Sequence, residues 1–181
     1  MSRYRRDHTP GATWFFTLVT GKRHRHLCDE PVRHALREAI ARTRADWPFT
    51  IDAWILLPDH LHCIWTLPAG DADFSVRWNL IKRRTSTAVT DRYWRAGGPL
   101  PSSRRELPFW QRRFWEHRIR DEEDFRRHVE YIHYNPVKHG LATAPVRWPY
   151  STFHRYVKEG ICQEDWGSGA PVRLPDTIGH E

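Results

Sequence analysis

The feature that most constrains the fold is a pair of apolar segments separated by two turn residues. Residues 49–57 (FTIDAWILL) and 60–67 (HLHCIWTL) are rich in aliphatic, aromatic and β-branched side chains, which favour strands. Pro58 and Asp59 lie between them, and both are residue types common in tight turns. The pattern therefore predicts two strands joined by a tight turn, and so a sheet in which these strands are antiparallel neighbours.

The second segment alternates in character, as side chains on opposite faces of a strand do. His60 and His62 project to one face, whereas Leu61, Cys63 and Trp65 project to the other. Two imidazoles side by side can bind one metal ion; two hydrogen-bonded histidines on a half-exposed strand are the alternative. The motif alone is weak, because 12 histidines in 181 residues give roughly one His-x-His by chance.

A second His-x-His occurs at His24-Arg25-His26, within the segment GKRHRHL. No apolar strand surrounds it, and basic side chains flank it on both sides. We interpret this copy as a solvated basic turn.

Further strands and helices follow from the spacing of apolar residues. The expected strands are Thr13–Thr20 and Phe114–Ile119; the expected helices are one capped by Asp29 or Glu30 that begins at Pro31 and ends near Trp47, one over residues 73–90, and one that begins at Asp121 and buries Phe125, Val129 and Ile132. Residues 96–108 are expected to form a flexible loop. The order β-α-β-β-α-β-α indicates an α+β fold of the ferredoxin-like, split βαβ type. We expect a mainly antiparallel sheet with helices on one face and an added C-terminal helix.

Composition points to an anionic partner. The chain has 29 basic and 22 acidic residues, a net charge of +7, and 10 tryptophans. Basic and aromatic residues together suit single-stranded nucleic acid, although packing of most tryptophans in the core is the alternative. Three widely spaced cysteines indicate neither a disulfide framework nor a cysteine zinc site. Neither a signal peptide nor an apolar run of transmembrane length occurs, so we expect a cytoplasmic protein without a membrane partner.

A second group of chemically active side chains lies on the helix that begins at Asp121. Tyr131 and Asn135 are one turn apart on one helix face. A divalent cation could lower the tyrosine pKa from about 10 and so prepare the hydroxyl to attack a phosphodiester. Asn135 offers a carbonyl oxygen as a third metal ligand. A packed core tyrosine is the alternative for Tyr131, and Tyr134 is the rival nucleophile.

Pro136 affects where Asn135 lies. The residue before a proline is biased away from the α region, so we expect Asn135 at the end of the helix or at a kink. Gly140 is a candidate for the residue that caps one further turn.

The chain contains three longer motifs, PDHLHCIW, WQRRFWEHRIRDEEDFRRHVEYIHYNPVKHGL and RWPYSTFHRYVKEG. Together they resemble REP-associated tyrosine transposases, which are single-tyrosine HUH endonucleases. The resemblance covers about Tyr4 to Gly160. It implies cleavage of single-stranded DNA at or near a palindromic hairpin, with a guide tetranucleotide read at its foot. It also implies Mg²⁺ or Mn²⁺ and a tyrosine that becomes linked to a 5′-phosphate. By position, the metal-binding pair is His60 and His62, the nucleophile is Tyr131, and Asn135 replaces a polar ligand that is often Gln in distant members.

The expected function is therefore that of a metal-dependent single-stranded DNA endonuclease and strand transferase. It would act on repetitive extragenic palindromic hairpins through a covalent 5′-phosphotyrosine, as a monomer or homodimer and without a nucleotide cofactor, since the chain has no P-loop. The alternatives are a non-catalytic, RRM-like module that binds structured nucleic acid and a replication-initiator or relaxase nickase. Transposition and processing of repeats are both compatible with this chemistry.

Basic residues outside these motifs are candidate DNA contacts, with a solvated basic face as the alternative. They are Arg3, Arg5 and Arg6 in the N-terminal arm, and Arg77, Lys82, Arg83 and Arg84 in the helix over residues 73–90.

The chain is expected to comprise a catalytic domain, residues 1–157, and an acidic tail rich in Gly and Pro, residues 158–181. The tail's acidic residues could lie over the basic surface and compete with DNA, and a spacer without structure is the alternative. These residues are Glu159, Glu164, Asp165 and Asp176.

Overall fold

The computed structural model describes residues 7–94, 109–169, 172 and 178. The expected loop at residues 96–108 and the arm residues Arg3, Arg5 and Arg6 lie outside this range. The helices and strands are β1 (Thr13–Val19), α1 (Glu30–Asp46), β2 (Thr50–Leu56), β3 (His60–Thr66), α2 (Phe74–Trp94), β4 (Trp115–Arg118), α3 (Glu122–Lys138) and α4 (Phe153–Lys158).

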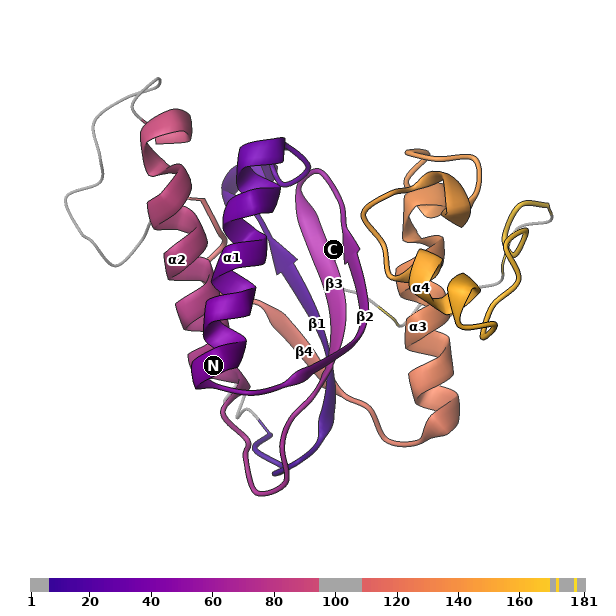
Figure 1. The fold of residues 1–181 in the computed structure, drawn as a ribbon, viewed down its shortest axis with the longest axis horizontal. Helices are drawn as coiled ribbons and strands as arrows, with labels where there is room; N and C mark the ends of the chain where they lie inside the picture. The colour runs from indigo at the N-terminus through magenta and orange to yellow at the C-terminus, as the bar shows by residue number, and fades with distance from the viewer. Residues whose placement is uncertain (1–6, 95–108, 170–171, 173–177, 179–181) are drawn as a thin grey trace, which may run out of the picture.

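The strands form one antiparallel sheet in the order β2-β3-β1-β4 (Figure 1). The predicted hairpin is confirmed, because Leu56 at the end of β2 pairs with Leu61 near the start of β3. In the centre of the sheet Thr17 of β1 pairs with His62 of β3. The ferredoxin-like fold is thus confirmed, and all its described strand pairs are antiparallel.

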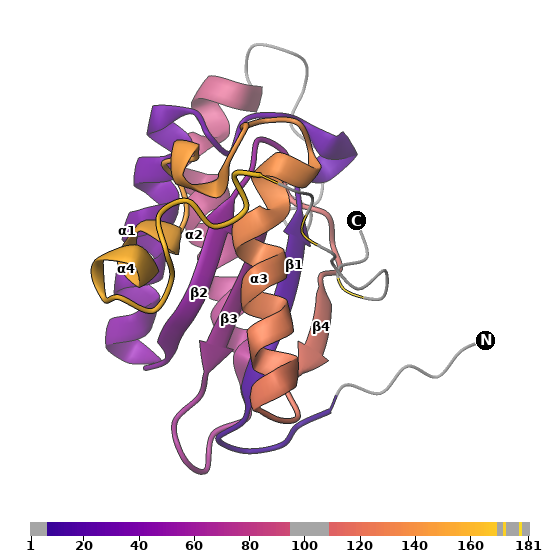
Figure 2. The same cartoon turned by 90° about the vertical axis from the view of Figure 1, so that its right-hand side faces the viewer.

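Helices cover both faces of the sheet. Helices α1 and α2 lie side by side on one face, and α3 crosses the other (Figures 1 and 2). The first face carries a core that includes Phe16, Leu61, Trp65 and Trp78. The second carries a smaller core in which α3 packs against the sheet; it includes Phe15, Ile55, Ile64, Tyr131 and Ile132. The one-face expectation holds for α1 and α2, and the added helix provides the third layer.

The ends of α3 follow the sequence rules closely. The Asp121 side chain caps the first turn by accepting a hydrogen bond from the Asp124 N–H at 2.8 Å. At the other end Gly140 adopts φ +65°, a conformation that favours glycine. The Leu141 N–H donates to the Pro136 carbonyl oxygen at 2.8 Å, which completes a Schellman-type helix end.

The expectation that α3 ends at Asn135 is wrong. Helix α3 continues through Asn135 and Pro136 to Lys138, so Asn135 lies inside the helix and not at its end. Asn135 and Pro136 are both buried, and packing against the sheet outweighs the local bias that proline imposes.

Two smaller predictions need adjustment. Pro31 is the second residue of α1, which begins at Glu30 after the N-cap Asp29. Helix α2 extends to Trp94, beyond the predicted end at residue 90. Element ends are decided by one or two hydrogen bonds, which apolar spacing does not encode.

The His24-Arg25 segment is exposed, as predicted for a solvated turn. The tryptophans that lie fully in the core are Trp14, Trp65, Trp78 and Trp110. Among the described residues no helix is long and apolar enough to cross a membrane.

Burial of His133 on α3 predicts a pH dependence of stability. Its Nε2 hydrogen-bonds with Thr152 Oγ1 at 3.0 Å, and burial lowers the His133 pKa to about 3, against about 6.5 in an unfolded chain. As the pH falls below about 6.5, the unfolded chain binds a proton that the folded chain does not, so acid favours unfolding.

As the pH falls, the free energy of unfolding should decrease more steeply in the wild type than in His133→Gln, and the difference in slope should approach about 1.4 kcal/mol per pH unit below about pH 5.5. Urea denaturation at pH values from neutral to mildly acidic measures both slopes. The exposed His34 provides the control, because His34→Gln should keep the wild-type slope. Equal slopes in all three proteins would contradict the prediction.

Candidate active site

The histidine pair lies in the second core, on the face covered by α3. The side chains of His60 and His62 are 2% and 0% exposed, and their ring centroids are 5.0 Å apart. Alternation along β3 places Leu61 and Cys63 in the opposite core, as the sequence predicted. The two imidazoles therefore lie side by side on one buried face of the sheet.

Each imidazole is held through its Nδ1 atom. His60 Nδ1 lies 2.7 Å from Asp59 Oδ1, and His62 Nδ1 lies 2.9 Å from Thr17 Oγ1. The hydrogen bond with His60 lowers the Asp59 pKa to about 2, so the carboxylate stays ionised and orients the ring. With Nδ1 engaged in both rings, Nε2 is the nitrogen that each would offer to a metal ion.

Tyr131 lies against this pair. Its ring centroid is 5.2 Å from that of His62 and 6.0 Å from that of Phe15, and the residue is 1% exposed. The rival nucleophile Tyr134 has a different environment, since its ring lies 6.1 Å from that of Trp166. The structure thus brings Tyr131 to the histidines.

Two residues near the site were missed by the sequence reasoning. Lys138 Nζ donates to the Tyr131 hydroxyl at 3.2 Å, and the His139 ring centroid lies 5.1 Å from that of His60. Both could have been found from spacing, because residues four, seven and eight positions after Tyr131 share its helix face. The third predicted ligand, Asn135, is fully buried on that face.

The residues present fit a divalent metal ion. Two imidazole nitrogens and one amide oxygen are neutral donors of the kinds that bind transition metals and manganese. Their burial on facing elements, β3 and α3, would remove water from the ligands. The donor set is therefore chemically suited to a divalent metal ion.

A second cluster of possible ligands connects β4 to α3. His117 Nε2 lies 2.9 Å from Asp124 Oδ2, and His128 Nδ1 lies 2.7 Å from the Asp124 backbone oxygen. The ligand atoms of the three residues lie within 4.8 Å of one another, a grouping that could hold a metal ion. Its signal in the sequence was the i, i+4 spacing of Asp124 and His128. In the present arrangement the His117 side chain bonds to the Asp124 carboxylate and stacks on the His128 ring at 4.7 Å between centroids, which connects the edge strand β4 to α3.

The predicted DNA-contacting residues of α2 are not brought to this site, because α2 and α3 cover opposite faces of the sheet. The prediction for Arg77 is wrong. Its side chain is 0% exposed and makes two hydrogen bonds to the Asp71 carboxylate, at 3.0 and 2.6 Å. Lys82 donates to the Gln111 carbonyl oxygen at 2.6 Å.

The other two basic residues of α2 differ from each other. Arg84 donates to Thr43 Oγ1 at 2.7 Å and so connects α2 to α1. Arg83 is exposed, which leaves it as the predicted α2 residue with a solvent-facing charge.

The first part of the tail packs against the folded domain through Trp166. Trp166 packs against Tyr134 and Phe153, whereas Glu159, Glu164 and Asp165 are exposed. Asp176 lies outside the described residues. Further along, Ile178 is buried in the same core as Tyr131, so the tail reaches the tyrosine's side of the sheet.

Comparison with known proteins gives concordant matches. Residues 12–135 match the family model described as Transposase IS200 like. The chain is 45% identical over 166 residues to the REP-associated tyrosine transposase of Escherichia coli, covering 92% of this chain and 91% of that protein. It is also similar to a solved structure of a REP-associated tyrosine transposase bound to a REP hairpin. That match has a TM-score of 0.81 and 43% identity, and covers 100% of this chain and 98% of the other.

The burial of Arg77 predicts a structural role that Arg83 does not share. Arg77→Ala would remove a fully buried side chain that donates to the Asp71 carboxylate and to the Pro48 carbonyl oxygen, and should lower the free energy of unfolding by about 3 kcal/mol. Arg83→Ala should stay within about 0.5 kcal/mol of the wild type, as surface substitutions usually do. Urea denaturation distinguishes the two. If Arg77→Ala lost as little unfolding free energy as Arg83→Ala, the buried Arg77 side chain would not stabilise the fold.

Proposed function

Because this chain belongs to the IS200-like transposase family, we propose that it is a tyrosine transposase that binds a REP hairpin and cleaves single-stranded DNA beside it. The observation that carries the proposal is the packing of Tyr131 against His62, whose ring in turn lies against that of His60. A binding module needs no such combination of nucleophile and paired ligands. The relative solved with a REP hairpin supports the DNA partner.

Tyr131 is the proposed nucleophile. Its hydroxyl oxygen attacks the phosphorus, so that a phosphotyrosine bond to the 5′-phosphate forms as the bond to the 3′ oxygen breaks. The phenol loses its proton and the departing 3′ oxygen gains one. One phosphodiester is exchanged for another, so no ATP is required, and the covalent step splits a difficult reaction into two easier ones.

Lys138 would assist at the tyrosine oxygen. Its ammonium group donates a hydrogen bond to the hydroxyl at 3.2 Å and lies 4.9 Å from the centre of the Tyr131 ring. A positive charge here favours negative charge on the oxygen as it attacks. Lys138 is exposed at the end of α3, where a DNA phosphate could also reach it.

His60, His62 and Asn135 are the proposed metal ligands. A bound ion would supply electrophilic stabilisation of the scissile phosphate. Magnesium prefers hard oxygen ligands and retains its waters, whereas imidazole suits manganese better. Two histidines and one asparagine should therefore bind magnesium weakly until a DNA phosphate joins them.

A covalent adduct tests the reaction. A labelled single-stranded hairpin incubated with the protein and Mn²⁺ should give a protein–DNA adduct on a denaturing gel. Tyr131→Phe should abolish that adduct, because it removes the attacking oxygen. Tyr134→Phe is the matched control and should retain it. If no hairpin substrate gave an adduct with the wild type, the non-catalytic, RRM-like binding module would be favoured.

Metal binding tests the ligand set. Calorimetry on the DNA-free protein should show weak Mg²⁺ binding and tighter Mn²⁺ binding, and His62→Ala should reduce the affinity for Mn²⁺ by about tenfold or more. His34→Ala, at an exposed position on α1, is the control and should bind like the wild type. Tight Mg²⁺ binding without DNA would show that these three residues are not the ligands.

A further inference from the structure

A second group of possible metal ligands lies outside the residues assigned above to the reaction. His117 of the edge strand β4 faces Asp124 and His128 in the first turns of α3, and one ligand atom of each residue lies within 4.8 Å of the others. Figure 2 shows this part of α3 beside β4. The three side chains thus connect a helix of one layer to an edge strand of the next.

The Asp124 carboxylate faces both imidazoles. Its Oδ2 is 2.9 Å from His117 Nε2, and its Oδ1 is 3.2 Å from His128 Nδ1. Neighbouring ligand atoms around a tetrahedral Zn²⁺ lie about 3.3 Å apart, because the bonds to nitrogen and oxygen are about 2.0–2.1 Å long. Two of the three separations are already close to this value, and a rotation of the His117 ring would close the third.

The ligand types also suit this ion. Two imidazole nitrogens and one carboxylate oxygen form a set typical of Zn²⁺. Burial lowers the pKa of His128, so its ring stays neutral at neutral pH and can bind a metal through a nitrogen lone pair. The side chains of His117 and Asp124 are 19% and 20% exposed, and water can therefore supply a fourth ligand.

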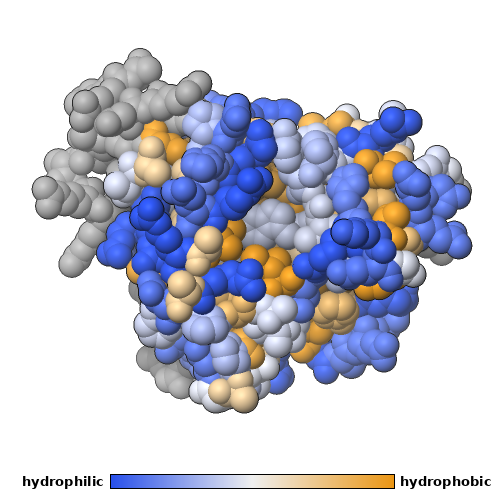
Figure 3. Space-filling model, viewed as in Figure 1, coloured by the Kyte–Doolittle hydropathy of each residue, from blue (hydrophilic) through white to orange (hydrophobic). Residues whose placement is uncertain are grey.

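The charged residues of α3 are divided between two sides of the helix. On the outer side Glu123 accepts hydrogen bonds from Arg126 and Arg127, at 2.8 and 2.7 Å. Figure 3 shows hydrophilic residues over this side of α3. Asp124 and His128, one turn apart, instead face β4, and Asp124 forms ion pairs with the two histidines. Its negative charge is thus directed into the cluster, where it favours a dication.

The cluster lies close to the proposed nucleophile. His128 precedes Tyr131 by three residues and so lies on the same side of α3. The Phe15 ring lies 4.8 Å from the His128 ring and 6.0 Å from the Tyr131 ring. An ion bound to the cluster would fix the first turns of α3 to the edge of the sheet, and with them the helix that carries Tyr131.

We propose that His117, Asp124 and His128 form a second metal site, which binds Zn²⁺ and fixes α3 to β4. The role of the ion is structural. The fold does not require it, because the same three residues also connect the two elements through the hydrogen bonds given above. Bound Zn²⁺ would add stability to the folded chain. The proposal does not depend on the proposed function, since none of its ligands takes part in the reaction.

Zinc titration of the full chain tests the site. The variant His60→Ala/His62→Ala removes the proposed catalytic ligands, and EDTA followed by dialysis removes bound metal. Calorimetry on this variant should show one Zn²⁺ per chain. Zinc at about 100 times its dissociation constant should raise the Tm by about 5 °C or more. Adding His117→Ala should reduce the zinc affinity by about hundredfold or more and abolish the rise in Tm.

The wild type provides a second measurement that leaves the catalytic ligands intact. It should lose one bound Zn²⁺ per chain on His117→Ala. Asp124→Asn keeps the size of the side chain but removes its charge, and should weaken zinc binding at this site by about tenfold or more. His34→Ala is the matched control, because His34 lies 3.4 Å from the Glu38 carboxylate on the exposed side of α1. It should keep the wild-type stoichiometry and Tm shift.

Two results would overturn the proposal. One is an equal zinc affinity and Tm shift with and without His117→Ala, because zinc would then bind only adventitiously to surface histidines. The other is the same number of bound ions in the wild type and in His117→Ala. Neither result bears on the proposed function, because zinc binding is measured without DNA, whereas the adduct at Tyr131 reports the reaction.

Discussion

The packing of α3 across the face of the sheet opposite α1 and α2 is the interaction on which the site depends. Phe15 lies at the centre of this contact, within 6.0 Å of the Tyr131 ring and 5.5 Å of the His62 ring. Val129 and Ile132 belong to the same core, so their apolar contacts fix the position of α3 along the sheet. Because Tyr131 lies between these two positions on the helix, the hydrophobic core itself sets the tyrosine against the histidines.

Hydrogen bonds then refine what the core positions. Asp59 and Thr17 each engage one imidazole, so both rings present the same nitrogen to the pocket. The Schellman-type end of α3 keeps the last helical turn intact, and that turn carries Lys138 toward the tyrosine oxygen. The site therefore combines side chains from a strand and a facing helix that hydrogen bonds orient, which suits a reaction that depends on orientation.

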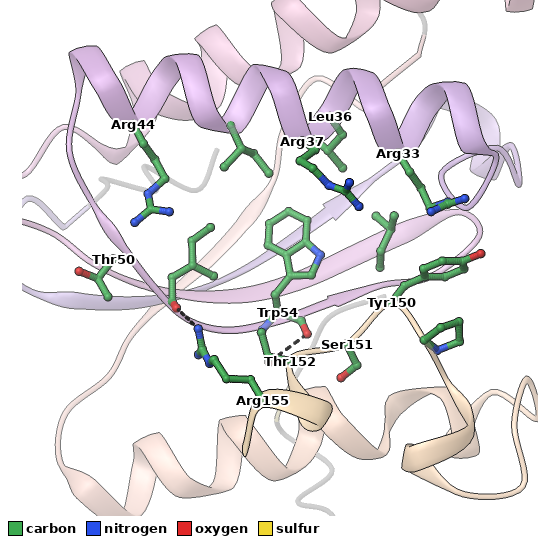
Figure 4. A pocket seen from close by; sticks show the side chains of 14 residues that line it. Arg33, Leu36, Arg37, Arg44, Thr50, Trp54, Tyr150, Ser151, Thr152 and Arg155 are labelled. Carbon is green, nitrogen blue, oxygen red and sulfur yellow. Dashed lines mark hydrogen bonds between the residues drawn. The ribbon is translucent and has the colours of Figure 1, made fainter. Parts of the chain in front are cut away.

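The histidine pair and the largest described group of neighbouring arginines lie in different regions of the molecule. The histidine pair lies on the α3 face, whereas four arginines, Arg33, Arg37, Arg44 and Arg155, line a groove at the β2 edge (Figure 4).

The sequence by itself determined the ferredoxin-like order, the hairpin, the face shared by His60 and His62, and the helix that carries Tyr131, since each depends on local alternation or helical spacing. It also contained the spacing of Lys138. Only the tertiary structure decided that Arg77 is buried beside Asp71, that Asn135 stays within the helix despite Pro136, and that the arginines of α1 and Arg155 line one groove. Those outcomes depend on which distant segments pack together, and burial there overrides the charge and backbone preferences of single residues.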